Sequence, residues 1–260
     1  MCAMNLAPPR GTRDFFPDEM RLRTWLFAHF REVSRLFAFE EYDAPVVESE
    51  ELFTRKEGEE IVEQLYGFQD KSGRHLALRP EMTPSLARLV LQKGSSLALP
   101  IKWFSIPQCW RYERTTRGRR REHFQWNLDI FGVPGVEAEA ELIAAVATLF
   151  SRLGLGPGEV GIKVSNRKIL ETVLSQSGVP PESFAQVCIL VDKLDKVPRD
   201  AVEEEMSIVG LEPDQIKALL DVLSLDSLDA VAATVGDTNE GIVEVKRLLE
   251  LADSYGLADL

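Results

Sequence analysis

CWRYERTTRGRRREHFQWNLDIFG, residues 109–132, is the stretch of the chain with the clearest structural pattern. In its second half, apolar and polar residues alternate. The apolar residues are Phe124, Trp126, Leu128 and Ile130, and the polar residues are His123, Gln125, Asn127 and Asp129. A period of two is typical of a β-strand with one apolar and one polar face. The first half alternates in the same way from Trp110 to Glu113. The stretch therefore predicts two antiparallel strands joined by a loop near Gly118.

The loop between these strands is strongly cationic. Its six arginines are Arg111, Arg114, Arg117, Arg119, Arg120 and Arg121. Self-repulsion makes a cluster of one sign unfavourable, so such a cluster usually faces an anion. A solvated loop without a ligand is the alternative. We interpret the loop as a site for a polyphosphate.

The polar residues of the two strands are expected to share one face of the sheet. If the hairpin is symmetric about Gly118, Arg111 lies opposite Gln125, and Glu113 lies opposite His123. A polar sheet face that is simply exposed to solvent is the alternative interpretation. The other face is aromatic enough to form the core, which leaves the polar face free for a ligand.

This face combines groups for an anion with groups for a cation. Arg111 can hold a phosphate or a carboxylate in a bidentate fork. Gln125 and Asp129, with Glu81 nearby if the sheet is contiguous, can accept hydrogen bonds from an ammonium or an imidazole N–H. The sequence contains no glycine-rich phosphate loop and no dinucleotide-binding fingerprint. We therefore expect a site that positions two substrates and stabilises charge without forming a covalent adduct.

The segment LRPEMTPSLARLVLQKG, residues 78–94, predicts a junction between a strand and a helix. Thr83 can cap the helix, Pro84 can occupy its first turn and Gly94 can end it. Arg79, Pro80 and Glu81 then lie at the junction, where polar groups are often presented to ligands.

The other elements are predicted from periodicity and from the residues that begin and end helices. They are a helix over 17–37, a short strand at 43–48, a hairpin of 65–68 and 75–78, a strand at 101–106, a helix at 137–152 and, beyond the breaker-rich segment 154–159, a short strand at 161–165 followed mostly by helices. The chain is thus expected to contain two domains, residues 1–158 and 159–260.

Composition narrows the class of protein. The chain has 260 residues, of which 45% are hydrophobic and 28% charged, as in a globular protein. Of its net charge of −12, residues 201–260 contribute −11, which argues against a general nucleic-acid coat there. No apolar run approaches the roughly 18 residues that a membrane span needs. The three cysteines and three histidines match no metal spacing.

The N-terminal sequence has neither an apolar signal core nor a basic amphipathic stretch. We expect a soluble protein with reduced thiols and no membrane partner. The expected location is the cytoplasm, or an organellar stroma or matrix if a leader has been lost.

Four segments resemble, in this order, the histidyl-tRNA synthetase family of class II aminoacyl-tRNA synthetases. They are PRGTRDFFP (9–17), APVVE (44–48), LRPEMTPSLAR (78–88) and WRYERTTRGRRREHFQWNLDIFG (110–132). The last looks like class II motif 2, and the helix at 17–37 with the strand around Pro45 looks like motif 1, which builds the dimer interface in the family.

The resemblance implies an α+β fold, an antiparallel sheet flanked by helices. Residues 1–158 would be the N-terminal part of the catalytic core, and residues 159–260 a mostly helical insertion domain.

The resemblance also implies a histidine site. Its residues are Glu81, Met82, Thr83, Arg111, Gln125 and Asp129. Glu81 and Thr83 match the residues that hold the ammonium group. Gln125 and Asp129 match those that recognise the imidazole, with aspartate where many members have glutamate.

The implied ATP site shares one residue with the histidine site. Arg111 matches the motif 2 arginine that binds the ATP α-phosphate and the histidine carboxylate, and is the implied catalytic residue. Glu113 matches the residue at the adenine amino group, and Arg119 the arginine near the γ-phosphate. His123 stands where many members stack a phenylalanine on adenine. The resemblance implies Mg²⁺ together with ATP, which is a substrate. No metal ligand is assigned in the sequence, and no tightly bound cofactor is expected.

The implied function is histidine–tRNA ligation, with histidine, ATP and tRNA(His) as substrates and a homodimer as the assembly. The family's motif 3 and anticodon-binding domain would follow Leu260, so the chain is expected to be incomplete. Two alternatives are a catalytically silent regulatory subunit of ATP phosphoribosyltransferase and an inactive dimerisation fragment. The regulatory subunits tend to lose the motif 2 arginines, whereas this chain has Arg111, Glu113 and Arg119.

Overall fold

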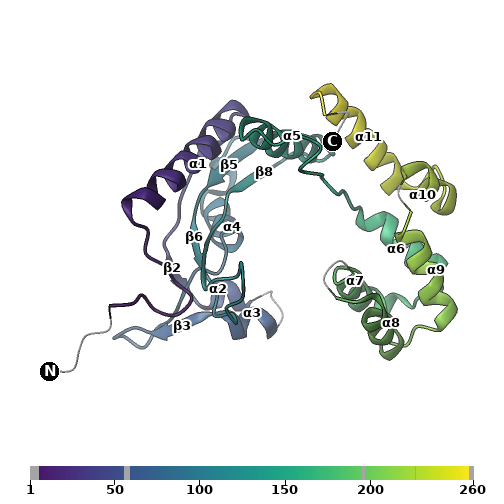
Figure 1. The fold of residues 1–260 in the computed structure, drawn as a ribbon, viewed down its shortest axis with the longest axis horizontal. Coiled ribbons are helices and arrows are strands. Elements are labelled where there is room, and N and C mark those ends of the chain that lie inside the picture. Colours follow the sequence, from purple (N-terminus) through teal and green to yellow (C-terminus); the bar gives the residue numbers. More distant parts are fainter. Residues whose placement is uncertain (1–5, 56–58, 195–196, 226, 258–260) are drawn as a thin grey trace. The chain divides into compact units, whose positions relative to one another are not determined.

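The structure is a computed structural model that describes residues 6–55, 59–194, 197–225 and 227–257 (Figure 1). The chain divides into two compact units, Met1–Gly156 and Pro157–Leu260. The first unit combines strands with helices, and the described part of the second is helical. No helix among the described residues is long and apolar enough to cross a membrane.

The expected N-terminal helix is confirmed as α1, Pro17–Leu36. Pro17 fits the first turn because its missing N–H would have no intrahelical partner there. The Glu19 carboxylate accepts the Phe16 N–H at 2.8 Å, which satisfies a backbone donor at the helix start. Phe30 stacks on Trp126 with ring centroids 5.0 Å apart, so α1 packs against the strand region that the alternation identified.

The strands of the first unit form three small sheets. The first has the order β1-β5-β8, the second β2-β4-β3, and the third pairs β6 with β7. Their bounds are Glu40–Glu41 (β1), Val47–Ser49 (β2), Tyr66–Gln69 (β3), His75–Leu78 (β4), Ile101–Ser105 (β5), Gln108–Trp110 (β6), Glu122–Phe124 (β7) and Asn127–Phe131 (β8). The α+β class is confirmed, but the sheet is not purely antiparallel because β1 runs parallel to β5.

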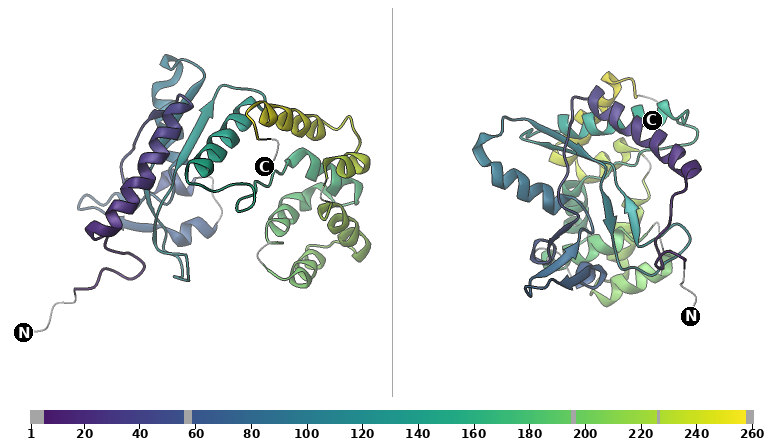
Figure 2. Two further views of the ribbon diagram at one scale, coloured as in Figure 1. Left: turned by 45° about the horizontal axis from the view of Figure 1, so that its top comes forward. Right: turned by 90° about the vertical axis from the view of Figure 1, so that its left-hand side faces the viewer.

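Helices α1 and α5, Glu137–Arg152, cover the apolar face of the β5–β8 pair (Figure 2). Val33 of α1 and Leu149 of α5 are buried in one cluster, against which Trp126 and Leu128 pack. The apolar half of the alternation in residues 123–130 therefore faces the core, as predicted. Asn127 and Asp129 of the polar half lie on β8 and point to the opposite face of that strand.

The segment around Pro45 differs from the expected strand at 43–48. Strand β2 begins only at Val47, and residues 42–46 are outside any strand. Pro45 explains the late start, because proline has no N–H for a ladder hydrogen bond. The hairpin of β3 and β4 is confirmed, with Tyr66 paired to Leu78.

The remaining helices of the first unit are short, apart from α4. They are α2, Glu51–Thr54, α3, Glu59–Gln64, α4, Thr83–Lys93, and the 3₁₀ turn Gly94–Ser96. Thr83 is the first residue of α4 and makes no side-chain cap, so its expected capping role was wrong. Gly94 has a φ of 52° and ends the helix as expected.

The second unit is built from helices packed around one core. They are α6, Arg167–Gln176, the 3₁₀ turn Pro181–Ser183, α7, Phe184–Val191, α8, Arg199–Ile208, α9, Pro213–Leu223, α10, Leu228–Val235, and α11, Glu240–Ser254. The expected strand at 161–165 was wrong, since residues 161–166 have no regular structure. A short β-type run forms a strand only beside a partner, and the described part of the chain offers it none.

Candidate functional site

The hairpin that carries the site has a different register from the expected one. Cys109 pairs with His123, and the Arg111 N–H donates to the Arg121 carbonyl at 2.9 Å. Arg111 therefore does not lie opposite Gln125, and the predicted register was wrong. The cause is the unequal length of the two arms. The tip closes where Thr116 bridges to Arg119, so four residues separate Arg111 from the bridge on one side and only one separates Arg121 from it on the other.

The structure nevertheless brings three expected residues together. Burial lowers the pKa of His123, the charge of Arg111 lowers it further, and Glu113 opposes that effect, in agreement with a register that places Arg121, the partner of Arg111, two residues from His123. The Arg111 Nε donates to the Pro80 carbonyl at 3.1 Å, which fixes the guanidinium beside the β4–α4 junction. Arg111, Glu113 and His123 thus form one cluster.

Arg119 extends from the loop toward this cluster. Its Nη1 lies 3.2 Å from the Glu113 Oε2, with the Arg119 side chain 72% exposed and that of Glu113 14% exposed. Ion pairs of this kind with one exposed partner contribute little stability. Arg119 can therefore leave Glu113 for a ligand at small energetic cost.

Gln125 and Glu81 lie around a buried thiol that the sequence did not single out. The Cys109 Sγ donates to the Gln125 Oε1 at 3.5 Å. Burial raises the pKa of Cys109 to about 11, while the nearby charges of Arg79 and Arg111 lower it and that of Glu81 raises it. The thiol therefore stays protonated and serves as a donor beneath the polar face.

Asp129 is a carboxylate with unused hydrogen-bonding capacity. It lies on β8 opposite Trp103 of β5. Burial raises the pKa of Asp129 to about 6. Its Oδ2 is buried and has no hydrogen-bond partner in the described part of the chain. Since buried polar groups are usually paired, this oxygen marks a place where a ligand N–H is expected.

Three polar side chains surround Asp129 that sequence analysis did not assign to the site: Tyr42, Ser105 and Asn127. Burial raises the pKa of Tyr42 to about 12, the Ser105 hydroxyl lowers it, and Asp129 raises it, which places Tyr42 near both. Ser105 pairs with Asn127 across the sheet. The alternation placed Asn127 on this face, but only the β5–β8 register brings Ser105 beside it.

The two residues after Glu81 differ in what they can offer a ligand. Met82 is fully buried, and its sulfur lies 3.7 Å from Arg79 Nη1. Its side chain is therefore part of the core, which leaves only its backbone for a ligand. Thr83 is exposed at the start of α4.

Arg79 has a structural role that the local sequence around it did not indicate. Its side chain is 3% exposed. Its Nε donates to the Gln108 carbonyl at 3.0 Å, and its Nη1 donates to the Asp43 carboxylate at 2.8 Å and the Ala44 carbonyl at 2.7 Å. Arg79 thus ties the segment before β2 to β6 beneath the site.

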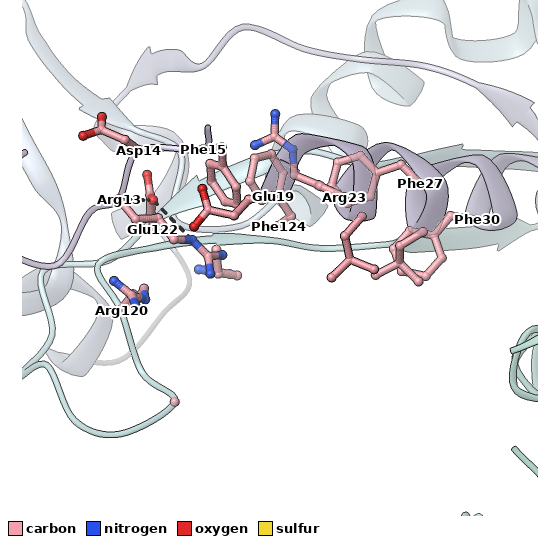
Figure 3. A pocket seen from close by; sticks show the side chains of 14 residues that line it. Arg13, Asp14, Phe15, Glu19, Arg23, Phe27, Phe30, Arg120, Glu122 and Phe124 are labelled. Carbon is pink, nitrogen blue, oxygen red and sulfur yellow. Dashed lines mark hydrogen bonds and ion pairs between the residues drawn. The ribbon is translucent and has the colours of Figure 1, made fainter. Parts of the chain in front are cut away.

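A cavity of about 790 Å³ lies between α1, the N-terminal segment and the arginine loop (Figure 3). Its lining includes Arg23, Phe27, Phe124 and Arg120. Of the expected site residues only His123 contributes to it. The cavity therefore meets the expected site at His123, but neither Gln125 nor Asp129 lines it.

The raised pKa of Asp129 predicts a pH-dependent effect of Asp129→Asn on stability. The folded pKa of about 6 lies above the ordinary value of 3.8, so the folded state holds an extra proton. The associated stability is complete below about pH 4 and is lost as the pH rises through 6. Asp129→Asn avoids this loss and should stabilise the chain by about 1–2 kcal/mol at pH 7, after allowance for partial exposure, but not at pH 4.

Urea denaturation at the two pH values measures this difference. Asp70→Asn is the control with the opposite sign, because hydrogen bonds from Arg74 lower the pKa of Asp70, so its replacement should destabilise the chain at pH 7. An equal effect of Asp129→Asn at both pH values would show that the carboxyl is solvated.

Comparison with known proteins identifies the relatives of the chain. A model of the histidyl-tRNA synthetase family matches residues 11–258. The chloroplastic/mitochondrial histidine–tRNA ligase of Arabidopsis thaliana is 55% identical over 256 residues, covering 98% of this chain and 53% of that protein. The histidine–tRNA ligase of Leptospira biflexa is 38% identical over 255 residues, covering 96% and 58%. The chain spans about half the length of the curated relatives it matches.

Solved structures share the fold. A histidyl-tRNA synthetase from Nostoc sp. PCC 7120 superposes with a TM-score of 0.81 at 21% identity, covering 99% of this chain and 60% of that one. An ATP phosphoribosyltransferase regulatory subunit/histidyl-tRNA synthetase from Bacillus halodurans gives 0.83 at 20% identity, covering 100% and 67%. Since the family model spans nearly the whole sequence, the chain belongs to the histidyl-tRNA synthetase family.

Proposed function

We propose that this chain is the part of a histidine–tRNA ligase that binds histidine and ATP. The observation that carries the proposal is the arrangement of Arg111, Glu113 and His123 on the hairpin beside Pro80, together with the buried and unpartnered Oδ2 of Asp129 on β8. A cationic fork next to a buried anionic acceptor suits an amino acid, which presents a carboxylate at one end and donors at the other.

In this proposal histidine lies across the polar face. Glu81 and Thr83, with the backbone of Met82, hold its ammonium group, and Arg111 holds its carboxylate. Asp129 accepts a hydrogen bond from one imidazole N–H, and Gln125 lies within reach of the ring or the ammonium group. A site whose buried polar groups need partners rejects side chains that cannot supply them.

ATP is proposed to lie along the hairpin. Arg111 contacts the α-phosphate, and Arg119 exchanges Glu113 for the γ-phosphate. Glu113 is then free to accept from the adenine amino group, over which His123 stacks. The parts of the chain that the structure describes contain no cluster of three His, Cys, Asp or Glu side chains suited to a metal. In this proposal Mg²⁺ arrives bound to the triphosphate as part of the substrate.

The reaction that follows has two steps. A histidine carboxylate oxygen attacks the α-phosphorus, and the bond to the β-phosphate oxygen breaks, which yields histidyl-adenylate and pyrophosphate. The acyl group then passes to a hydroxyl of the terminal ribose of tRNA(His), with AMP as the leaving group. Arg111 would stabilise the charge that develops on the α-phosphate oxygens.

The two units would have different roles. We propose that the first is the N-terminal part of the class II catalytic core, with motifs 1 and 2, and that the second is the insertion domain. The exposed apolar residues of α1, which include Leu22 and Trp25, suit a homodimer interface. The cytoplasm and an organellar stroma or matrix are both compatible with this function, and a fluorescent fusion would distinguish them.

The decisive experiment is histidine-dependent ATP–pyrophosphate exchange in two proteins. One is residues 1–260 alone, and the other is a chimaera in which residues 1–260 precede the C-terminal remainder of the Arabidopsis relative. We expect exchange by the chimaera and negligible exchange by the chain alone, because electrostatic groups absent from the chain are often worth about 10² to 10³ in rate each.

Two other outcomes of the exchange experiment would contradict these expectations. A folded chimaera that binds neither histidine nor ATP would favour the regulatory or dimerisation alternatives. Robust exchange by residues 1–260 alone would show that the chain needs no further catalytic groups.

A further inference from the structure

The N-terminal segment, residues 9–13, lies along the base of the arginine loop. The Gly11 carbonyl accepts the Arg121 N–H at 2.9 Å, and the Arg13 N–H donates to the Glu122 Oε1 at 3.0 Å. The segment also closes on itself, because the Thr12 N–H donates to the Pro9 carbonyl at 3.0 Å. The residues PRGTR are distinctive in the sequence, yet none of them belongs to the site described above.

Glycine is required at position 11 for two reasons. Its φ is +88°, in the left-handed region that favours glycine. A Cβ at this position would also lie 2.6 Å from the Arg121 Cγ and 2.9 Å from the Arg121 Cβ. The second contact is close to the Arg121 backbone, so a side-chain rotation cannot relieve it. The backbone of the segment therefore lies so close to Arg121 that only glycine fits at position 11.

A buried carboxylate makes the second attachment. Glu122 is 5% exposed. Besides the Arg13 N–H, it accepts the Gln108 Nε2 at 3.0 Å, and the Arg13 Nε lies 3.8 Å away (Figure 3). A buried charge is stable only when it is paired and hydrogen-bonded. Glu122 thus holds the N-terminal segment and β6 together.

The attachment at Arg121 continues into the proposed site. The Arg121 carbonyl accepts the Arg111 N–H at 2.9 Å, so Gly11, Arg121 and Arg111 are linked through backbone hydrogen bonds in series. The Arg121 guanidinium lies 3.8 Å from the centroid of the Tyr112 ring, and its Nε donates to the Glu113 carbonyl at 3.3 Å. The residues on either side of Tyr112 are those proposed to bind the α-phosphate and adenine.

We infer that residues 9–13 form a strap that fixes the base of the arginine loop, with Gly11 and Arg13 as positioning residues for the nucleotide-binding hairpin. The inference rests on the proposed function only for the identity of the ligand. The strap itself follows from the contacts of Gly11, Arg13 and Glu122.

The first test uses residues 1–260 and amide hydrogen exchange. Gly11→Ala should accelerate exchange of the Arg121 and Arg111 amides about tenfold or more, because both hydrogen bonds depend on the strap. Gly73→Ala is the matched control, since Gly73 also has a positive φ, of 76°, but a Cβ added there would meet no described atom within 4 Å. A variant lacking residues 1–13 removes the strap without creating a clash and should show the same acceleration.

Unchanged exchange at Arg121 and Arg111 in the folded deletion variant would overturn the strap. So would equal acceleration in Gly73→Ala, because the effect would then reflect general destabilisation. Neither result depends on catalysis, so this test stands even if the proposed function fails.

The second test measures steady-state kinetics in the chimaera. Misplacement of the hairpin by Gly11→Ala should raise the KM for ATP about tenfold and the KM for histidine less, because ATP is proposed to contact Arg111, Glu113 and Arg119 of the hairpin whereas histidine shares only Arg111 with it. Gly73→Ala should leave both values unchanged. Equal increases in the two KM values would overturn the positioning role. A chimaera that is inactive with the unaltered chain would count against the proposed function, and the strap would then be judged by hydrogen exchange.

Discussion

Replacing Arg79 with alanine should destabilise the first unit by about 3 kcal/mol or more, because three hydrogen bonds of a buried side chain are lost together. Arg79 is 3% exposed, and its partners are the Asp43 carboxylate and the carbonyls of Ala44 and Gln108. The two carbonyls would lose their donor, and the guanidinium would leave a cavity in the core. Urea denaturation followed by tryptophan fluorescence measures the loss.

Arg74→Ala is the matched control for this prediction. Arg74 also pairs with a carboxylate, since its Nε lies 2.6 Å from the Asp70 Oδ2, but its side chain is 74% exposed. Exposed pairs contribute little to stability, because solvent screens them. Similar effects of the two substitutions would show that Arg79 is not a structural centre of the unit.

Arg79 also illustrates where sequence reasoning ends. The sequence placed it at a strand-to-helix junction beside Glu81, which is correct, but its partners lie 29 to 36 residues away along the chain. No periodic pattern connects such positions. The same limit applies to Tyr42 and Ser105, which reach Asp129 only because β1 and β8 flank β5.

Local patterns predicted the parts of the fold that depend on local forces. The alternation in residues 123–130 correctly assigned Trp126 and Leu128 to the core face. It could not give the register of the hairpin, because register depends on the lengths of the two arms at the loop. The extra residues between Arg111 and Thr116 follow no periodic rule, so the assumption of symmetry about Gly118 placed every facing pair wrongly.

The register has a consequence for the chemistry of Arg111. Because Arg111 pairs with Arg121 instead of Gln125, its side chain meets Pro80 at the start of the β4–α4 junction. The Nε is committed to the Pro80 carbonyl at 3.1 Å. This bond aims the guanidinium from the start of the β4–α4 junction.

Arg111→Ala in the chimaera should therefore lower kcat for pyrophosphate exchange about 10² to 10³-fold, the usual loss when a preorganised charge-stabilising group is removed. Arg111→Lys separates charge from geometry. Lysine keeps the positive charge but has no Nε to donate to Pro80 and no planar fork for a phosphate or carboxylate. If geometry dominates, the kcat of Arg111→Lys should exceed that of Arg111→Ala by less than about tenfold.

Pre-steady-state formation of histidyl-adenylate measures this step directly, and thermal melting checks that both variants fold. Full activity of Arg111→Lys would mean that a point charge is sufficient and that the anchor to Pro80 is incidental. Full activity of Arg111→Ala would remove Arg111 from the reaction. We expect the activity of Arg111→Lys to be much closer to that of Arg111→Ala than to that of the unaltered protein. The reason is that one hydrogen bond sets the position of the Arg111 side chain, and binding of the ligand needs two further hydrogen bonds from its guanidinium group.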